Sequence, residues 1–397
     1  MDKIVVNNLT KIFGQSPEKG MGLLKKGLNK EEIFARTGLT VGVQAASFSV
    51  QAGEIFVIMG LSGSGKSTLV RLLNRLIEPT AGEVLIDGED LTKMNAERLR
   101  DVRRSKMSMV FQRFALFPHR TVQQNVEYGL EVQGVDKQER AKKAKEALEM
   151  VGLASYRDQY PDQLSGGMQQ RVGLARALAN DPDVLLMDEA FSALDPLIKK
   201  EMQDELLELQ SEMQKTIIFI THDLDEALRI GDRIALMKDG AIVQVGTPED
   251  ILTDPKNDYV RRFVEDVNRA KVLKAEHVMK RAEKVTVGKD GPRVALNRMQ
   301  ARGYSSLFAV DRKNDLLGVL TAEGAQKAMK EDKALEDVIV RDVVKVDPET
   351  PLEDIVSQMA ETAHPVAVVN EAGRLRGAIV RGSVIGALAG KEVNGDE

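Results

Sequence analysis

The chain has 397 residues, no cysteine and a formal net charge of −5. A chain of this length is too long for one hydrophobic core, so two or three domains are expected. The absence of cysteine excludes disulfide bonds, thiolate zinc sites and thiol nucleophiles, and the net negative charge argues against nucleic acid as the main partner.

The first clear helix signal lies in a lysine-rich stretch at residues 15–40. Asn29, followed by Glu32 three residues later, matches the capping-box pattern, and Gly38 is a typical helix end. We therefore predict a helix between these signals. The whole stretch is interpreted as a surface insertion.

Residues 60–68 read GLSGSGKST and match the phosphate-binding pattern G-x4-G-K-[ST]. The run EIFVIMG before them predicts a buried strand, and the run TLVRLLNRLI after them has leucines at helical spacing. A glycine-rich loop between a strand and a helix directs backbone N–H groups and the helix N-terminus at an anion. The loop is therefore expected to bind the phosphates of a nucleotide, and the alternative is a glycine-rich turn that binds nothing.

The residues of this P-loop have separate expected roles. Lys66 should reach the β- and γ-phosphates, and the Ser67 hydroxyl should bind Mg²⁺. The glycines can adopt positive φ and let the backbone approach the phosphates closely. The predicted nucleotide contacts of the loop are Gly60, Leu61, Ser62, Gly63, Ser64, Gly65, Lys66, Ser67 and Thr68.

A second apolar run, DVLLMDEA at residues 183–190, ends in two carboxylates. A lone strand with this ending is more often followed by a solvated turn, but this one follows a P-loop. Asp188 is expected to hold Mg²⁺, usually through water, and Glu189 is expected to polarise the attacking water. The pattern is that of a Walker B strand.

The octapeptide LSGGMQQR at residues 164–171 narrows the function furthest. It resembles the signature of ATP-binding cassette (ABC) ATPases, in which Ser165, Gly166 and Gly167 would contact the γ-phosphate of ATP held by another cassette. Met168 stands where the general pattern has glutamine, and it begins the helix behind these contacts, so the departure should matter little. One P-loop and one signature imply that two copies of the chain form a head-to-tail dimer.

Three further residues fit the same resemblance, which covers about residues 1–265. Gln112 ends the apolar run MSMVFQ and corresponds to the Q-loop glutamine that meets Mg²⁺ and the water. Asp195, in SALD, resembles the D-loop residue that crosses the dimer. His222 ends the run TIIFITH and matches the switch histidine that contacts the γ-phosphate. Each residue is a weak signal alone, but their order and spacing agree with the family.

The resemblance also implies an adenine contact near the start of the chain. Phe13, in LTKIFG, lies where the family places an aromatic ring that stacks on the base. Val43 would pack beside that ring if the strand register holds. The alternative for Phe13 is burial in the core.

Most ABC cassettes lack an insertion like residues 15–40, and its presence resembles importers of glycine betaine, proline and related solutes. The runs RVGLARAL and MDEAFSALDPLIKKEMQDEL fit the same subgroup. The resemblance implies integral-membrane permease subunits as partners, and a substrate-binding protein or domain that is reached only through them. Apolar runs here fall short of the ~20 residues of a transmembrane helix, and no signal peptide begins the chain. We therefore expect a peripheral subunit at the cytoplasmic face of the inner (plasma) membrane.

An apolar cluster follows the Q-loop glutamine and consists of Phe114, Leu116, Phe117 and Pro118. Such a cluster would suit a groove that receives a helix of the permease. The alternative is that these residues form part of the core of the helical subdomain.

Two similar units follow the cassette, and residues 285–321 parallel residues 344–380, with Gly318 aligned to Gly377. Each unit reads strand, helix, strand, turn, strand, helix, and the pair resembles tandem CBS (cystathionine-β-synthase) domains. The resemblance implies regulation by ionic strength or by a cyclic dinucleotide. AMP or ATP binding in the usual CBS mode is not expected, because the Thr/Ser–Asp pair that contacts the ribose is incomplete in both units.

The predicted fold is α/β, with a P-loop ABC cassette (a RecA-like core plus antiparallel β and helical subdomains) followed by an α/β tandem CBS pair. The predicted boundaries are 1–265 for the cassette, about 125–179 for its helical subdomain, 266–397 for the CBS region, and about 275–335 and 336–391 for its halves. The predicted function is ATP-driven import of an osmoprotectant, with ATP and Mg²⁺ as cofactors. The alternatives are a soluble ABC ATPase that acts on ribosomes or DNA, and an importer of amino acids or choline.

Overall fold

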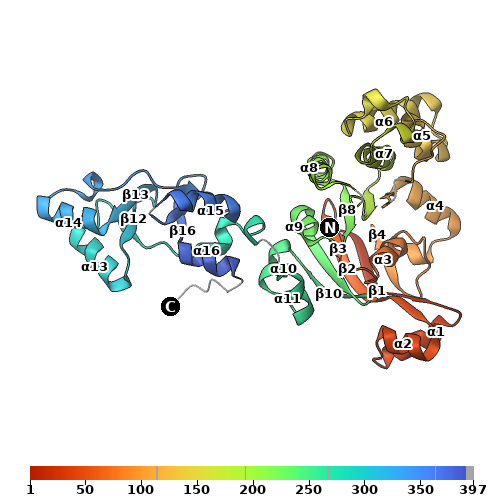
Figure 1. Ribbon diagram of the computed structural model, residues 1–397, viewed down its shortest axis with the longest axis horizontal. Coiled ribbons are helices and arrows are strands. Elements are labelled where there is room, and N and C mark those ends of the chain that lie inside the picture. The colour runs from red at the N-terminus through yellow and green to blue at the C-terminus, as the bar shows by residue number, and fades with distance from the viewer. Residues whose placement is uncertain (113–114, 193, 266–268, 363, 390–397) are drawn as a thin grey trace. The chain divides into compact units, whose positions relative to one another are not determined.

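The computed structural model describes the chain except for residues 113–114, 193, 266–268, 363 and 390–397. The chain divides into two compact units, Met1–Glu265 and Asp266–Glu397 (Figure 1). Within the described ranges, every helix is too short or too polar to span a bilayer.

A six-stranded sheet lies at the centre of the first unit. Its order is β10-β9-β3-β8-β7-β6, and all strands except the edge strand β10 run parallel. Strands β3, β7 and β8 are buried along their whole length, as is typical of a parallel sheet. The strands are β3 (Ile55–Met59), β6 (Met107–Val110), β7 (Val184–Asp188), β8 (Thr216–Thr221), β9 (Arg233–Lys238) and β10 (Ala241–Gly246).

A four-stranded antiparallel sheet has the order β2-β1-β4-β5. One hydrophobic cluster combines Val6 and Phe48 of this sheet with Ile58 of β3 and Leu69 of helix α3. This core therefore joins both sheets to the helix that follows the P-loop. The elements are β1 (Asp2–Phe13), β2 (Thr40–Gln51), β4 (Ala81–Ile86), β5 (Glu89–Asp90) and α3 (Lys66–Leu73).

The insertion forms two helices, α1 (Pro17–Lys25) and α2 (Lys30–Thr37), between β1 and β2. The predicted capping box is confirmed, because the Asn29 side chain accepts a hydrogen bond from the Glu32 N–H and the Glu32 carboxylate accepts one from the Asn29 N–H, both at 2.9 Å. Gly38 ends α2 in the left-handed conformation, as predicted. A small separate core under the insertion contains Ile12, Ile33, Leu39 and Val41.

A helical layer carries the signature sequence. Its first helix, α5, begins at Val122 rather than near residue 125, because Thr121 and Gln124 form a capping box that starts the helix earlier. The helices of the first unit after α3 are α4 (Ala96–Ser105), α5 (Val122–Val132), α6 (Lys137–Met150), α7 (Gly166–Leu178), α8 (Pro196–Met213), α9 (Leu224–Ile230), α10 (Pro248–Thr253) and α11 (Asp258–Phe263). The 3₁₀ helices of the first unit are η1 (Leu91–Lys93), η2 (Ala154–Tyr156) and η3 (Pro161–Gln163).

The second unit repeats one arrangement, a three-stranded sheet with two helices, in each half. The halves use equivalent registers, since Gly318 pairs with Ala309 and Gly377 pairs with Val368. A cluster that contains Phe308 and Ala367 joins the two sheets. The elements are η4 (Arg269–Lys271), α12 (Ala275–Val278), β11 (Lys284–Thr286), α13 (Pro292–Arg302), β12 (Ser306–Val310), β13 (Leu316–Thr321), α14 (Ala322–Glu331), η5 (Leu335–Asp337), β14 (Lys345–Val346), α15 (Leu352–Glu361), β15 (Val366–Val369), β16 (Leu375–Ile379) and α16 (Arg381–Leu388).

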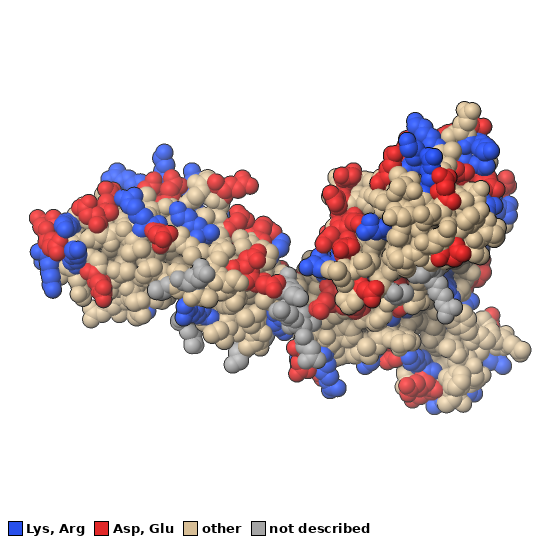
Figure 2. Space-filling model, turned by 45° about the horizontal axis from the view of Figure 1, so that its top comes forward, with Lys and Arg blue, Asp and Glu red and all other residues tan. Residues whose placement is uncertain are grey.

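Charged side chains of both signs are intermingled on the face of each unit that Figure 2 shows. A nucleic-acid-binding surface usually carries a continuous basic patch. The described residues on this face form none.

Candidate functional site

The P-loop connects β3 to α3 and needs glycine at two of its positions. Gly60 has a φ of 152°, and a Cβ there would lie 2.2 Å from the Met237 carbonyl oxygen. Gly65 has a φ of 103°, and a Cβ there would lie 2.3 Å from the Gly42 carbonyl oxygen. Both the backbone conformation and the close approach therefore exclude a side chain.

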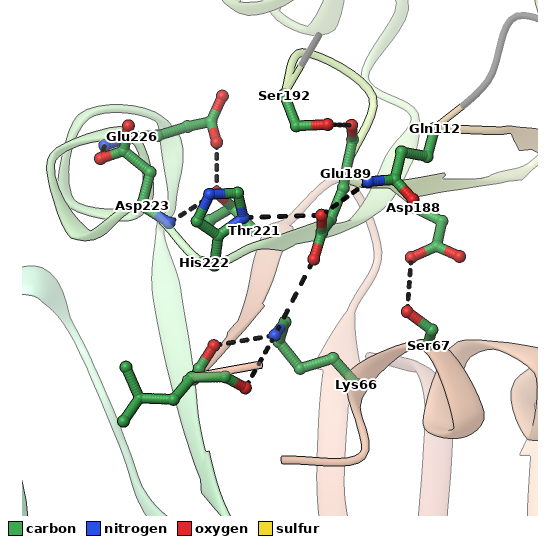
Figure 3. A network of polar contacts seen from close by, with 12 residues as sticks. Lys66, Ser67, Gln112, Asp188, Glu189, Ser192, Thr221, His222, Asp223 and Glu226 are labelled. Carbon is green, nitrogen blue, oxygen red and sulfur yellow. Dashed lines mark hydrogen bonds and ion pairs between the residues drawn. The ribbon is translucent and has the colours of Figure 1, made fainter. Parts of the chain in front are cut away.

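Lys66 lies at the start of α3 with its ammonium group inside the loop. The Lys66 Nζ donates hydrogen bonds to the carbonyl oxygens of Gly60 (2.8 Å) and Leu61 (3.2 Å), and it lies 3.9 Å from Glu189 Oε1 (Figure 3). Burial lowers the pKa of Lys66, while the carboxylates of Glu189 and Asp188 oppose that shift. A buried ammonium that rests mainly on carbonyl oxygens suits a ligand that brings negative charge.

Asp188 ends the buried strand β7 and faces the Ser67 hydroxyl, which donates to Asp188 Oδ1 at 3.2 Å (Figure 3). Burial raises the pKa of Asp188, and the Ser67 hydroxyl and the nearby Arg71 partly oppose this rise. Two oxygen ligands at neighbouring positions of an octahedral Mg²⁺ site, with bonds of about 2.1 Å, lie about 3 Å apart. These two groups therefore fit Mg²⁺.

Protein side chains alone would not enclose that ion. Among the described residues, no group of three or more His, Cys, Asp or Glu side chains could hold a metal ion. Mg²⁺ commonly binds through one or two protein oxygens, with phosphates and water completing its shell. The pair of Ser67 and Asp188 matches that pattern.

Glu189 is the point at which three segments meet. The Gln112 side-chain amide donates to Glu189 Oε2 at 3.0 Å, and His222 Nδ1 lies 3.5 Å from the same oxygen (Figure 3). Glu189 has a φ of 46°, a conformation that non-glycine residues seldom adopt and that often marks a functional site. Its N–H donates to the Ile220 carbonyl oxygen at 3.0 Å, and its carbonyl oxygen accepts from the Ser192 hydroxyl at 2.9 Å, which together fix this conformation.

A buried network behind His222 was missed by the sequence analysis. The Thr221 hydroxyl bonds to the carboxylate of Glu226, which is buried and also accepts from the Gln203 amide at 3.1 Å. Burial raises the pKa of Glu226. The Asp223 side chain caps α9 at the Glu226 N–H, and this D-x-x-E spacing right after a strand was the available signal. The network holds both neighbours of His222 in place.

Phe13 and Val43 have different surroundings. Phe13 is 38% exposed, with Lys11 Nζ 5.2 Å from the ring centroid, so its ring is open to stacking. The prediction that Val43 contacts the nucleotide beside this ring is wrong, because Val43 is fully buried in the cassette core. Gly42 lies against the ring instead, since a Cβ there would be 2.7 Å from Phe13 Cε2.

The signature lies at the N-terminus of α7. The Ser165 side chain caps this helix by accepting from the Met168 N–H at 3.4 Å, and Ser165 and Gly166 are exposed. Asp195 is exposed at the start of α8, and its side chain makes no capping hydrogen bond. A Cβ on Gly167 would lie 2.8 Å from Ile198 Cγ2, so α7 and α8 touch. The described residues show no hydrogen bond from the signature to the P-loop.

Models of two protein families match the chain. The ABC transporter family matches residues 43–192, and the CBS domain family matches residues 335–390. The first half of the second unit lies outside the second match but repeats the same order of strands and helices.

Two relatives that align with nearly the whole chain, and one solved cassette structure, point to the same family. The chain is 62% identical over 388 residues to the glycine betaine transport ATP-binding protein OpuAA of Bacillus subtilis (98% of this chain and 93% of the relative). It is 50% identical over 395 residues to the glycine betaine/proline betaine transport system ATP-binding protein ProV of Escherichia coli (99% of each chain). The dimeric ATP-binding cassette MJ0796, bound to ADP and Pi, is 34% identical with a TM-score of 0.52, over 62% of this chain and 98% of that one. The chain therefore belongs to the ATP-binding proteins of ABC transporters, in the group that contains the glycine betaine transport proteins, and it hydrolyses ATP to drive import.

Proposed function

We propose that this chain energises the import of glycine betaine or a closely related solute. The observation that carries the choice of solute is the 62% identity to a glycine betaine transport protein over 98% of the chain. The site residues would contact nucleotide rather than cargo, so the choice of solute rests on this similarity. ATP binding would close two copies head to tail, and hydrolysis would reopen them.

The division of the phosphate site supports this cycle. Lys66, Ser67 and Asp188 lie together around the P-loop, whereas Ser165 and Gly166 are exposed on a separate helix. In a head-to-tail pair, the signature of one copy would cap the ATP held by the other, with the exposed Asp195 near the seam. The exposed Phe13 ring would stack on the adenine.

The chemistry at the γ-phosphate would rest on Glu189. Its carboxylate would orient the attacking water and accept its proton, while Gln112 and His222, which already contact this carboxylate, would hold the water and the γ-phosphate in line. Lys66 would neutralise charge on the phosphates. Mg²⁺, held by Ser67 and Asp188 with Gln112 nearby, would supply further charge stabilisation.

A groove of about 390 Å³ between β6 and the helical layer would receive the permease. Phe111, Phe117 and Tyr128 line it, and the rings of Phe117 and Tyr128 lie 4.6 Å apart. Of the other residues in the predicted cluster, Leu116 is half-buried and Pro118 is exposed, and Phe114 lies outside the described residues. An apolar groove of this kind suits a short amphipathic helix, which would hold the subunit at the cytoplasmic face of the membrane and connect it indirectly to a substrate-binding protein.

The assay that tests this function is ATP-driven uptake into vesicles that contain the neighbouring permease subunits. We expect glycine betaine to accumulate and to compete with labelled substrate better than proline, choline or histidine. The matched control is the same vesicle loaded with ADP instead of ATP. Uptake of choline or histidine in preference to glycine betaine would contradict the proposed solute, and ATP turnover without any uptake would contradict the transport role.

The second unit would regulate transport in response to ionic strength or a cyclic dinucleotide. Screening offers a physical route, since the Debye length falls from about 10 Å at 0.1 M salt to about 3 Å at 1 M. A charged face of this unit held to anionic lipid would be released over that range.

Removal of residues 266–397 is therefore expected to leave ATP turnover intact and to flatten its dependence on salt. Transport by the full chain should rise with KCl in vesicles of anionic lipid and should change little in vesicles of neutral lipid. Both profiles are to be repeated with and without a cyclic dinucleotide. The same salt response in the shortened chain and the full chain would remove the sensor role of this unit.

A further inference from the structure

His222 follows the end of β8 and carries a largely exposed side chain. The imidazole is 56% exposed, and its Nδ1 lies 3.5 Å from Glu189 Oε2. The direction in which such a ring points depends mainly on the backbone that carries it. The Thr221 hydroxyl fixes this backbone, since its oxygen accepts from the Asp223 N–H at 3.0 Å and closes a turn across His222 (Figure 3).

A buried carboxylate holds this turn from behind. The Thr221 hydroxyl, whose oxygen already accepts from Asp223, donates its one proton to the carboxylate of Glu226, which is 3% exposed. The Asp223 carboxylate accepts in turn from the Glu226 N–H at 3.3 Å. The residues on both sides of His222 are therefore fixed through Glu226.

The same carboxylate connects the turn to α8. The buried Gln203 amide donates to Glu226 Oε1 at 3.1 Å. Lys199 Nζ lies 3.6 Å from Glu226 Oε2 and 2.6 Å from Asp223 Oδ2. Helix α8 begins directly after Asp195 and touches the signature helix α7. Because apolar side chains of similar volume often stabilise a core at least as well as a buried ionic cluster, the place of this cluster beside His222 calls for a functional reason.

We propose that Glu226 is a positioning residue for ATP hydrolysis, which holds the turn that carries His222 and ties this turn to α8. The direction of the imidazole then depends on how α8, the helix that begins at the D-loop, is seated against Glu226. The proposal rests on the proposed contact of His222 with the γ-phosphate and does not depend on the transported solute.

Thr221→Val tests the link to the histidine, because valine keeps the branched shape and the strand preference of threonine but lacks the hydroxyl. In the full-length chain we expect ATP turnover to fall by about ten- to a hundredfold, since a misplacement of about 1 Å can cost about a hundredfold. The Kd for ATP should stay unchanged, because the P-loop is intact. Thr221→Ser keeps the hydroxyl and should turn over ATP at close to the wild-type rate.

The matched control is Thr253→Val, the same change at an exposed threonine of α10. Its hydroxyl donates to the Glu249 carbonyl oxygen of the same helix. Turnover and the Kd for ATP should equal those of the wild type.

Gln203→Met tests the link to α8, because it removes the amide that α8 offers to Glu226 and keeps a side chain of similar length. Turnover should fall, again with an unchanged Kd for ATP. The double variant with Thr221→Val should be no slower than Thr221→Val alone, since residues of one network do not act additively. Losses that multiply in the double variant would show that α8 does not act through Glu226 and would overturn the tie.

Two further outcomes would overturn the proposal. Wild-type turnover in Thr221→Val, with only a lower melting temperature, would show that the network merely stabilises the fold. An equal loss of turnover in Thr221→Ser would show that the methyl group of the threonine matters rather than its hydroxyl.

His222→Ala, measured in parallel, separates this proposal from the role of the histidine itself. Wild-type turnover in His222→Ala would contradict the contact of His222 with the γ-phosphate, on which the proposal rests. A loss of turnover in His222→Ala together with wild-type turnover in Thr221→Val would contradict the positioning role alone.

Discussion

Glu189→Gln is expected to reduce ATP turnover by at least about a hundredfold while ATP binding is retained, because a general base typically contributes about 10²- to 10⁴-fold to the rate. The substitution keeps the shape of the side chain and its capacity to accept from Gln112, but it removes the basic oxygen. It also removes the carboxylate near Lys66 and His222, so the affinity for ATP should not fall. The variant should therefore accumulate as an ATP-bound dimer.

Phosphate release, ATP binding and size-exclusion chromatography with ATP would measure these effects. Glu201→Gln, the same change at an exposed position of α8, is the matched control and should behave as the wild type. Turnover at the wild-type rate in Glu189→Gln would show that another group accepts the proton. A loss of ATP binding would instead show that Glu189 supports the P-loop.

The sequence located the P-loop and Walker B residues because their signals are local. Each motif joins a strand whose whole length is buried to a loop that follows it directly, as β3 and β7 do. The α2 helix was predicted for the same reason, since its capping box spans only residues 29–32. In such segments, the residues that decide the structure lie within a few positions of one another.

Val43 was assigned wrongly because its position depends on the pairing of two strands. The β1–β2 ladder contains register shifts on both sides of Lys11, which pairs with Val43. Each irregularity exchanges the two faces of a strand, so alternation counted along the sequence cannot tell which side chain faces the Phe13 ring. The 15–40 insertion separates the two strands and adds further uncertainty to that count.

The network behind His222 was missed for a related reason. Its members come from separate segments, with Gln203 on α8 and Glu226 on α9 meeting the end of β8 at Thr221. From the sequence alone, a glutamate is predicted to lie at the surface, because glutamate is seldom fully buried unless it is paired. Only the fold shows that its partners surround it.

Ser165→Arg is expected to reduce hydrolysis by at least about a hundredfold and to leave ATP binding to the P-loop intact. A single preorganised donor at a developing charge is typically worth about 10²- to 10³-fold, and the arginine also adds bulk where the second cassette must approach. The P-loop should be unaffected, because no hydrogen bond of the described residues links it to the signature. Ser165→Ala removes the same hydroxyl, together with a helix cap worth about 1 kcal/mol, but adds no bulk. It therefore separates the effect of the lost donor from the effect of the obstructed approach.

The decisive measurement combines this change with Glu189→Gln in one chain. If the signature of one copy completes the ATP site of the other, the double variant should bind ATP and remain a monomer on size-exclusion chromatography, whereas Glu189→Gln alone should form a dimer. A dimer in both cases would show that the signature lies outside the contact, and a loss of ATP binding in the double variant would place Ser165 in the site of its own chain. The exposure of Ser165 and Gly166 at the start of α7 argues for the first outcome, because these groups can meet a phosphate only where a second surface brings one to them.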